Sequence, residues 1–481
     1  MNEESPLDTD RAKGLAAEPG HLERRLGLFT ATMIVVGSMI GSGIFVAPSI
    51  MAGLVQSPGI LLGLWVFGGL FTLLGALAYG ELAAMAPHAG GQYVFLSQAY
   101  SRFWGFLYGW TLFLVIQTGF NAAVSIAFAK YLGVFIPQLG EGNMLFSLGW
   151  YSLNSAQLVG CGVIIVLTAV NILGVREGAF VQNLFTVLKL GALVALIVVG
   201  LTKASDIAAN FTPLFEPEAG KEGLKLGFLA AVAVAMSQAL FSYDAWNTVT
   251  FVGEEVRDPH RSLPRALVLG CLITTAVYVL TNVAYMANIP LAEMQNIKED
   301  RVAQTLAQRL FGEVGVTLIV IAILVSAFGC VNGLVLGGAR VCYAMARDGL
   351  FFPSCGRLHP SRRTPAVALV YQGIWSCVLT LSGTYGDLLT YTTFASVLFG
   401  ALTVAGVYRL RAIQPDRPRP YRCWGYPVTP ALYLVIAVPF LFYVIQGKPG
   451  AAGYGLLLVL TGVPVYFLFS AGWRKSSQSQ P

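Results

Sequence analysis

Charged residues are scarce in this 481-residue sequence. They make up 11% of it, whereas hydrophobic residues make up 56% and the mean hydropathy is +0.68. A soluble domain carries about 25% charged residues, so a soluble protein is excluded. The net charge of +6 gives no indication of nucleic-acid binding, because in a membrane protein the positions of the basic residues matter more than their sum.

The sequence also lacks the usual signatures of enzymes and of secreted proteins. It has no CxxC pair, no His/Glu metal motif and no G-x-S-x-G elbow on a recognisable turn, and its four histidines lie in polar connections. We therefore expect no enzyme activity, no cofactor, no metal and no disulfide framework. Residues 1–26 are polar and lack the apolar core of a secretory signal, which predicts a cytoplasmic tail before a retained first helix.

Long apolar runs dominate the rest of the chain. A run of about 18 residues or more can cross a bilayer as a helix. Two short helices are also expected outside the spans, at 303–311 and just after residue 90. The runs predict an all-α integral membrane protein with twelve spans, at 27–54, 59–86, 103–133, 153–174, 178–201, 225–253, 264–287, 314–345, 364–382, 386–408, 428–446 and 454–473.

Basic residues are divided unequally between the two sets of connections. The set that includes both termini holds 21 of the 30 basic residues, the opposite set holds eight, and Lys189 lies inside a span. Cytoplasmic loops of membrane proteins carry the excess of lysine and arginine. Both termini are therefore predicted to be cytoplasmic, with a C-terminal tail at 474–481.

The sequence Gly41-Ser42-Gly43 interrupts the first apolar run. Glycine costs about 1 kcal/mol in a helix interior, so two glycines around a serine favour an open helix. In lipid, the freed backbone groups are tolerated only where protein or a water-filled cavity satisfies them. Freed N–H groups suit a carboxylate and freed carbonyls suit an amine, and this pair of charges is typical of an amino acid. The alternative is a glycine notch for helix packing.

A second interrupted helix is expected one repeat later if the protein is a transporter. The segment 241–247 (FSYDAWN) lies about 200 residues after Gly41, which matches five spans per repeat. Asp244, near mid-membrane, costs about 2.5–3.5 kcal/mol on insertion scales and indicates a functional site. Alternatively, Asp244 caps the second half of a kinked helix. Both alternatives place a break here.

Lys189 is the other charge that lies deep in a span, about eleven residues from its start. This depth disfavours the structural alternative, in which the lysine snorkels to the cytoplasmic interface. We expect a fixed or titrating cation that faces the bundle interior, where a sodium ion would otherwise hold helices one and eight together. Glu81, near the inner end of span two, is expected to contact the inner loops.

Five motifs, in order, resemble those of the amino acid–polyamine–organocation superfamily, and within it the L-type amino acid transporter branch and its bacterial relatives. The resemblance covers about residues 26–473, almost the whole chain. The motifs are GSGIF at 41–45, PHAGGQY at 87–93, FSYDAWN at 241–247 with GEEVRDP at 253–259, Arg340 with ARDG at 346–349, and RPRPY at 417–421.

This resemblance implies a five-plus-five inverted repeat with broken helices 1 and 6 and two extra helices. The first repeat would span 27–201 and the second 225–410, followed by two helices in 428–473. Such proteins work by alternating access around a central amino-acid site. A multi-pass protein of the plasma membrane, most simply a bacterial inner membrane, is the implied location.

The resemblance also implies roles for individual residues. In similar proteins the backbone at Gly41, Ser42 and Gly43 holds the substrate carboxylate. Carbonyls at the positions of Ile40 and Phe241 hold the amine, and Phe241 also acts as an aromatic gate.

A lysine that matches Lys189 bridges helices one and eight in sodium-independent members, and Ser326 is the candidate partner on helix eight. Four further residues are candidates for the pocket wall: Phe120, Asn121, Thr392 and Thr393.

Two departures from the family pattern bear on substrate and partner. Many relatives have glycine at the position of Ala245, so the second break is expected to be tighter. Asp244 would narrow the pocket for small residues or favour a cationic one. Residues 131–152 contain no cysteine, so no disulfide-linked heavy subunit is expected.

The function that these observations favour is secondary active transport of neutral L-amino acids, by sodium-independent exchange or by proton coupling. The alternatives are a sodium-coupled symporter, which Lys189 disfavours, and a cationic amino acid or polyamine carrier, which Asp244 supports. A membrane-embedded enzyme, a channel and a non-transporting sensor are the remaining classes. Two broken helices at related positions favour a gated, occluded site over a continuous pore.

Overall fold

The computed structural model describes residues 24–149, 152–204, 207–215, 228–297, 301–382 and 385–478. Most of the predicted N-terminal tail, the start of the predicted span at 225–253 and the last residues of the predicted C-terminal tail lie outside these residues. Within them, the chain is almost entirely helical. The elements that follow are therefore arranged as a helical membrane bundle.

Twelve apolar helical segments in the described residues correspond to the twelve predicted spans. Nine are long and apolar enough to cross a membrane, and three, at Phe228–Tyr243, Ala366–Ser382 and Gly455–Ser470, are shorter. The helices that form the spans are α2 (Leu28–Met39) with α3 (Gly43–Val55), α4 (Pro58–Met85), α6 (Arg102–Thr111) with η1 (Leu112–Ile116) and α7 (Gln117–Leu132), α8 (Ser155–Leu173), α9 (Val175–Thr202), α11 (Phe228–Tyr243) with α12 (Thr248–Phe251), α13 (Pro259–Asn288), α15 (Val302–Arg347), α16 (Ala366–Ser382), α17 (Tyr385–Ile413), α18 (Val428–Gly447) and α19 (Pro449–Gln478).

Short elements occupy the connections between the spans. Both short helices expected from the sequence are present: α5 follows Gly91, and a positive φ of 63° at Gly312 separates the first turns of α15 from the rest. The remaining elements, which include one antiparallel hairpin, are α5 (Gln92–Ala99), η2 (Pro137–Leu139), β1 (Met144–Ser147), β2 (Ser152–Asn154), α10 (Ile207–Asn210), η3 (Gly253–Glu255), α14 (Leu291–Met294) and η5 (Pro353–Gly356).

The helices pack in two groups. In the first group α13 lies against α4 and α2, and α11 lies against α3 and α4; in the second group α7, α8, α15 and α16 pack against one another. The buried apolar side chains form two large clusters, and α15 contributes to both. Helix α9 contacts α15, α13 and α2, and so joins the two groups.

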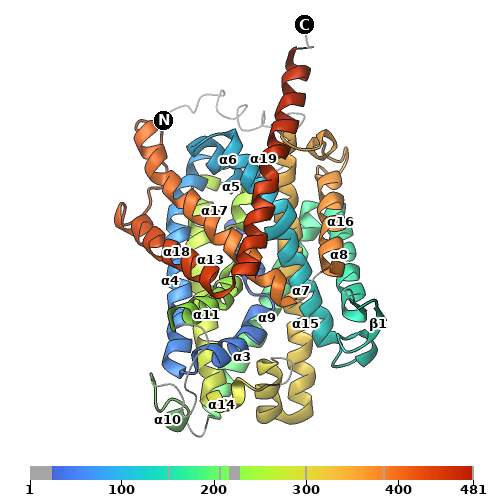
Figure 1. The fold of residues 1–481 in the computed structure, drawn as a ribbon, viewed down its shortest axis with the longest axis vertical. Coiled ribbons are helices and arrows are strands. Elements are labelled where there is room, and N and C mark those ends of the chain that lie inside the picture. The colour runs from blue at the N-terminus through green and yellow to red at the C-terminus, as the bar shows by residue number, and fades with distance from the viewer. Residues whose placement is uncertain are drawn as a thin grey trace, which may run out of the picture.

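The two ends of the bundle carry different elements (Figure 1). α5 and α6 lie at the end toward which α19 projects, whereas α10, α14 and the β1 hairpin lie at the opposite end. Large apolar side chains such as Leu188, Leu318 and Val435 remain exposed on the outer surfaces of the helices. Exposed apolar side chains along long helices are expected where the surrounding solvent is lipid.

Candidate functional site

The first and sixth of the twelve spans are both broken, as predicted. α2 ends at Met39 and α3 begins at Gly43. α11 ends at Tyr243, and α12 begins only at Thr248, after a turn. The two breaks touch each other, because a Cβ atom added to Gly43 would lie 2.1 Å from the Oγ of Ser242. Only glycine at this position permits so close an approach.

Lys189 reaches the carbonyl end of the first broken helix. Its Nζ donates to the carbonyl oxygens of Gly37 at 2.7 Å, Ile40 at 2.6 Å and Ser326 at 3.2 Å. The Ser326 hydroxyl also donates to the Ile40 carbonyl, at 3.1 Å. Both Lys189 and Ser326 are buried. The ammonium therefore bridges α2 and α15 from α9, with three carbonyls around it, and the snorkelling alternative does not describe this side chain.

The remaining carbonyls at the end of α2 are also occupied. The thiol of Cys330 donates to the Ser38 carbonyl at 3.0 Å. The hydroxyl of Tyr278, on α13, lies 2.8 Å from the Met39 carbonyl and 2.8 Å from the Ser242 carbonyl. Tyr278 therefore joins the ends of the two broken helices. Because buried carbonyls in a membrane must find donors, these side chains make the break at α2 stable.

The start of α3 has the opposite chemistry. The Phe45 N–H donates to the Ser42 carbonyl at 3.1 Å. Among the described residues, the N–H groups of Gly43 and Ile44 have no hydrogen-bond partner. Unpaired N–H groups at the positive end of a helix form a site for an anion. The first break thus presents unpaired N–H groups beside a closed set of carbonyls.

A small cavity lies against this helix start. Of the six predicted substrate-binding residues, five line it: Gly41, Ser42, Gly43, Phe241 and Asp244. We name it the cradle. Ile40 does not line the cradle, because its carbonyl is turned toward Lys189 and Ser326.

The cradle has an aromatic wall. The ring of Phe120 stacks on that of Phe241, with centroids 4.9 Å apart and planes at 18°. Of the other candidate wall residues, Asn121 donates to the Ser376 hydroxyl instead, and Thr392 and Thr393 are not among the cradle's lining residues. Sequence reasoning did not single out Cys330, Val124 or Leu334, which do line it. Helical spacing could have identified them, because Val124 lies one helical turn after Phe120, and Cys330 and Leu334 lie one and two turns after Ser326.

Asp244 lies at the turn of the second break. Its carboxylate accepts from the Ala245 N–H at 2.6 Å, so it caps the turn and also faces the cradle. Ala245 has a φ of 64°, a left-handed conformation that normally favours glycine. A tighter break is the expectation at this position, and the structure shows a left-handed φ at Ala245.

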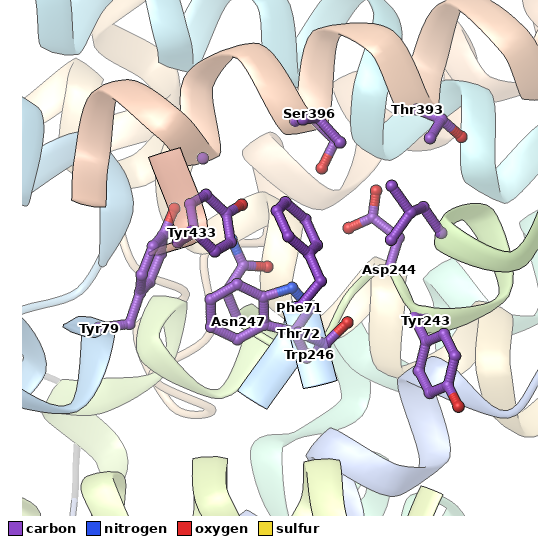
Figure 2. A pocket seen from close by; sticks show the side chains of 13 residues that line it. Phe71, Thr72, Tyr79, Tyr243, Asp244, Trp246, Asn247, Thr393, Ser396 and Tyr433 are labelled. Atoms are coloured by element: carbon purple, nitrogen blue, oxygen red, sulfur yellow. The ribbon is translucent and has the colours of Figure 1, made fainter. Parts of the chain in front are cut away.

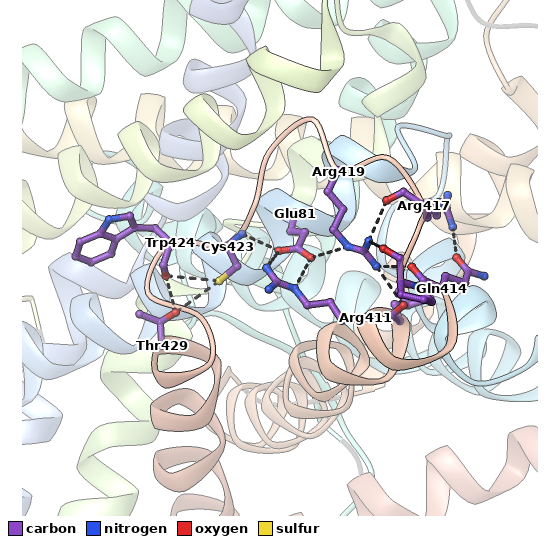
Figure 3. A network of polar contacts seen from close by, with 10 residues as sticks. Glu81, Arg411, Gln414, Arg417, Arg419, Cys423, Trp424 and Thr429 are labelled. Carbon is purple, nitrogen blue, oxygen red and sulfur yellow. Dashed lines mark hydrogen bonds and ion pairs between the residues drawn. The ribbon is translucent and has the colours of Figure 1, made fainter.

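Glu81 anchors the connection between α17 and α18, as expected for a contact to the inner loops (Figure 3). Its carboxylate accepts from Arg411 at 2.6 and 2.9 Å and from the Cys423 N–H at 2.7 Å. Arg419 lies 3.3 Å away. The RPRPY motif at 417–421 thus belongs to the connection between α17 and α18, which is held against the end of α4. We name this connection the strap.

A fully buried ion pair closes the same end of the bundle. The Arg340 guanidinium, on α15, donates to the Glu255 carboxylate at 2.8 Å, and neither side chain is exposed. The N–H groups of Arg25 and Leu26 donate to the Glu255 carbonyl, both at 2.9 Å. The segment before α2, the turn after α12 and α15 therefore meet at one residue.

The sequence of residues 26–468 matches the amino acid permease family. The chain belongs to the amino acid permease family. Members of this family are transporters, and the chain is accordingly a transporter, not an enzyme.

Curated relatives of this permease align over nearly all of it. It is 34% identical to the human large neutral amino acids transporter small subunit 2 over 447 residues, which cover 93% of this chain and 80% of the relative. It is 32% identical to the serine/threonine exchanger SteT of Bacillus subtilis, with 94% and 98% covered. It is 30% identical to the human b(0,+)-type amino acid transporter 1, with 94% and 90% covered.

Proposed function

We propose that this permease is a secondary active transporter of neutral L-amino acids that works by alternating access and without sodium. The observation that carries this proposal is the first break, where free N–H groups adjoin a cavity and a lysine holds the carbonyls. Exchange of one amino acid for another is the favoured mode, since relatives of similar length include an exchanger. Proton-coupled uptake is the second mode.

The backbone of the first break would select the substrate. The carboxylate would accept from the N–H groups of Gly43 and Ile44, at the positive end of α3. The amine would lie beside the carbonyl end of α11 at Phe241. The Phe120–Phe241 stack would then separate the bound amino acid from one side of the membrane.

Lys189 would replace a coupling ion. A sodium ion is held by several oxygen ligands, and here an ammonium occupies the centre of three carbonyls from α2 and α15. Because the lysine charge is covalently fixed, the α2–α15 contact needs no ion from solution. Loading of the site would then depend on the amino acid alone.

The orientation proposed is the one with both termini in the cytoplasm. The end of the bundle that carries α5, the strap and the Arg340–Glu255 pair would face inward, in agreement with the excess of basic residues there. A plasma-membrane location is supported by the bacterial relative. Residues 131–152 contain no cysteine, so we propose no disulfide-linked heavy subunit.

The test is uptake of radiolabelled amino acids into proteoliposomes. We expect uptake of neutral L-amino acids that rises several-fold when the vesicles are preloaded with unlabelled substrate, and that is unchanged when choline replaces sodium. Protein-free vesicles are the control. A sodium requirement would favour a symporter, and uptake driven by a pH gradient in empty vesicles would favour proton coupling. The absence of any uptake or exchange would overturn the proposal.

A further inference from the structure

Two cysteines face each other across the contact between α8 and α16. The thiol of Cys161, on α8, lies 3.7 Å from the carbonyl oxygen of Cys377, on α16, and the thiol of Cys377 lies 3.9 Å from the carbonyl oxygen of Cys161. The two thiols are also near enough to interact with each other directly. Both cysteines are free thiols, and neither lines the cradle.

The two helices pack antiparallel and place the cysteines at one level. On one side of the pair, the Gln157 amide donates to the Leu381 carbonyl at 2.9 Å. On the other side, the Thr364 hydroxyl donates to the Ile172 carbonyl at 3.1 Å. Positions on α8 therefore rise as their partners on α16 fall, and the two cysteines lie opposite each other in this register. Their contact is set by the packing of two whole helices.

Glycines on both helices bring the two backbones close together. A Cβ atom added to Gly160 would lie 3.0 Å from the Cγ2 of Thr380, and one added to Gly373 would lie 2.8 Å from the Oγ1 of Thr168. Small residues let the backbones of membrane helices approach each other. A disulfide needs such an approach, because its Cα atoms must lie within about 7 Å of each other. The α8–α16 contact therefore favours a bond between its two thiols.

The pair lies near the outer surface of the bundle and not in its core. Both cysteines are partly exposed, and their neighbours Leu158 and Val378 are 49% and 43% exposed. α8 begins at Ser155, directly after the hairpin, so Cys161 lies about 9 Å from that end of the helix at about 1.5 Å per residue. In the proposed orientation this end faces out of the cell, where thiols meet oxidants instead of the reducing cytoplasm.

We propose that Cys161 and Cys377 are an oxidation site that forms a disulfide bond between α8 and α16 in the presence of a peroxide. One thiol sulfur attacks the O–O bond of hydrogen peroxide, takes one oxygen as a sulfenic acid and releases water. The second thiol sulfur attacks the sulfenic sulfur, the S–O bond breaks, and the leaving hydroxide takes the second thiol's proton as water. The two thiols lose two electrons, and one peroxide becomes two waters.

The bond would join two helices that already belong to one packed group. α7, α8, α15 and α16 pack against one another, so the bond would lie within this group and not between it and the helices that carry the two breaks. The cysteines are 216 residues apart in sequence. A disulfide that closes a long loop stabilises a protein mainly by restricting its unfolded chain. Oxidation should therefore raise the melting temperature and leave amino-acid exchange unchanged.

Peptide mapping tests the bond directly. The full-length permease is treated with hydrogen peroxide in detergent, unfolded, alkylated at its remaining thiols and digested without reduction for mass spectrometry. We expect one peptide pair joined through Cys161 and Cys377, with two hydrogens lost, and alkylation of the other five of the seven cysteines. A monomer band on a non-reducing gel shows that the bond lies within one chain, and dithiothreitol should restore both thiols. Alkylation of all seven cysteines after peroxide, or a sulfinic acid in place of the bond, would overturn the proposal.

Variants then assign the effect on stability to this pair. Peroxide should raise the melting temperature of the wild type by several degrees and leave those of Cys161→Ser and Cys377→Ser unchanged, because neither variant can form the bond. Cys342→Ala is the matched control: it removes a buried thiol that lies near the Cys355 thiol, and it should respond like the wild type. An equal shift in the wild type and in Cys161→Ser would overturn the proposal.

Transport is measured separately, so that the two proposals can fail independently. Leucine exchange by the oxidised wild type should stay within twofold of that by the reduced protein, and a larger loss would overturn the placement of the bond within one helix group. The absence of exchange before oxidation would count against the proposed function alone. The peptide map of the wild type decides the oxidation site even where a variant does not fold.

Discussion

The two broken helices open the backbone in the same way but stabilise it differently. At the α2–α3 break, glycines are required by close approach, and the freed carbonyls are bound by donors from other helices: Lys189, Ser326, Cys330 and Tyr278. At the α11–α12 break, Ala245 takes a left-handed φ of 64° and Asp244 caps its own turn. The first break is stabilised by several donors from other helices, whereas the second is stabilised mainly by its own turn, and Tyr278 contacts both.

This difference separates two parts of recognition. Backbone groups at the first break are common to every α-amino acid and cannot distinguish one side chain from another. The carboxylate and aromatic rings at the second break are side-chain chemistry, which can. We infer that the first break defines the class of substrate and the second defines its members. The four predictions that follow test this division, from the largest expected effect to the smallest.

Replacing Lys189 tests whether the first break is held by its cation. Lys189→Ala removes the side-chain donor of the Gly37 carbonyl and one of the two donors of the Ile40 carbonyl, and an unpaired buried polar group costs about 1–3 kcal/mol. Leucine exchange should fall at least 100-fold. Lys203→Ala, at the exposed end of the same helix, is the control. Rates within twofold of the wild type would contradict a holding role.

Gly43→Ala tests the contact between the breaks. The added Cβ would meet the Oγ of Ser242 at 2.1 Å, so α3 and α11 must separate. Leucine affinity, measured by isothermal titration calorimetry, should weaken about 10- to 100-fold. Gly191→Ala is the control, because a Cβ there has open space. An unchanged affinity in Gly43→Ala would show that the contact does not shape the site.

Tyr278→Phe removes the hydroxyl shared by both breaks. A buried hydrogen bond contributes about 0.5–1.5 kcal/mol, so the exchange rate should fall about tenfold. Tyr285→Phe is a matched control on the same helix, since the buried Tyr285 hydroxyl has no hydrogen-bond partner among the described residues. Equal exchange rates for the two variants would mean that the breaks are not coupled through α13.

Ala245→Gly removes the strain of the second break. A non-glycine residue in the left-handed region costs about 1–2 kcal/mol, so the variant should raise the melting temperature by a few degrees. Ala239→Gly, within α11, should lower it, because glycine costs about 1 kcal/mol in a helix interior. Thermal unfolding in detergent measures both. A lower melting temperature for Ala245→Gly would mean that the turn is not strained.

Features that depend only on neighbouring residues in the sequence could be predicted. The spans follow from run length, the breaks from Gly41-Ser42-Gly43 and Asp244, and the position of Lys189 from its depth in an apolar segment. The contact of Lys189 with helices one and eight came from the family resemblance. No local signal fixed its three acceptors, because these depend on how α9 is rotated against α2 and α15.

The features that the sequence did not predict depend on which face of each helix points into the bundle. Tyr278 is one of many tyrosines, and nothing near it in sequence indicates that it joins two helix ends 239 and 36 residues away. The aromatic cavity beside the second break draws its lining from α4, α11 and its following turn, α17 and α18 (Figure 2). Ile40 faces Lys189 instead of the cradle, since a rotation within the opened segment decides which way each carbonyl points.

The buried pair of Arg340 and Glu255 has a consequence for the speed of the transport cycle. In the proposed alternating-access cycle, opening of the inner side would part α15 from the turn after α12. Parting a buried ion pair costs about 3–5 kcal/mol, which slows a step about 150- to 5,000-fold. Opening of the inner side would therefore be the rate-limiting step of the cycle, and the turnover rate would rise steeply on warming.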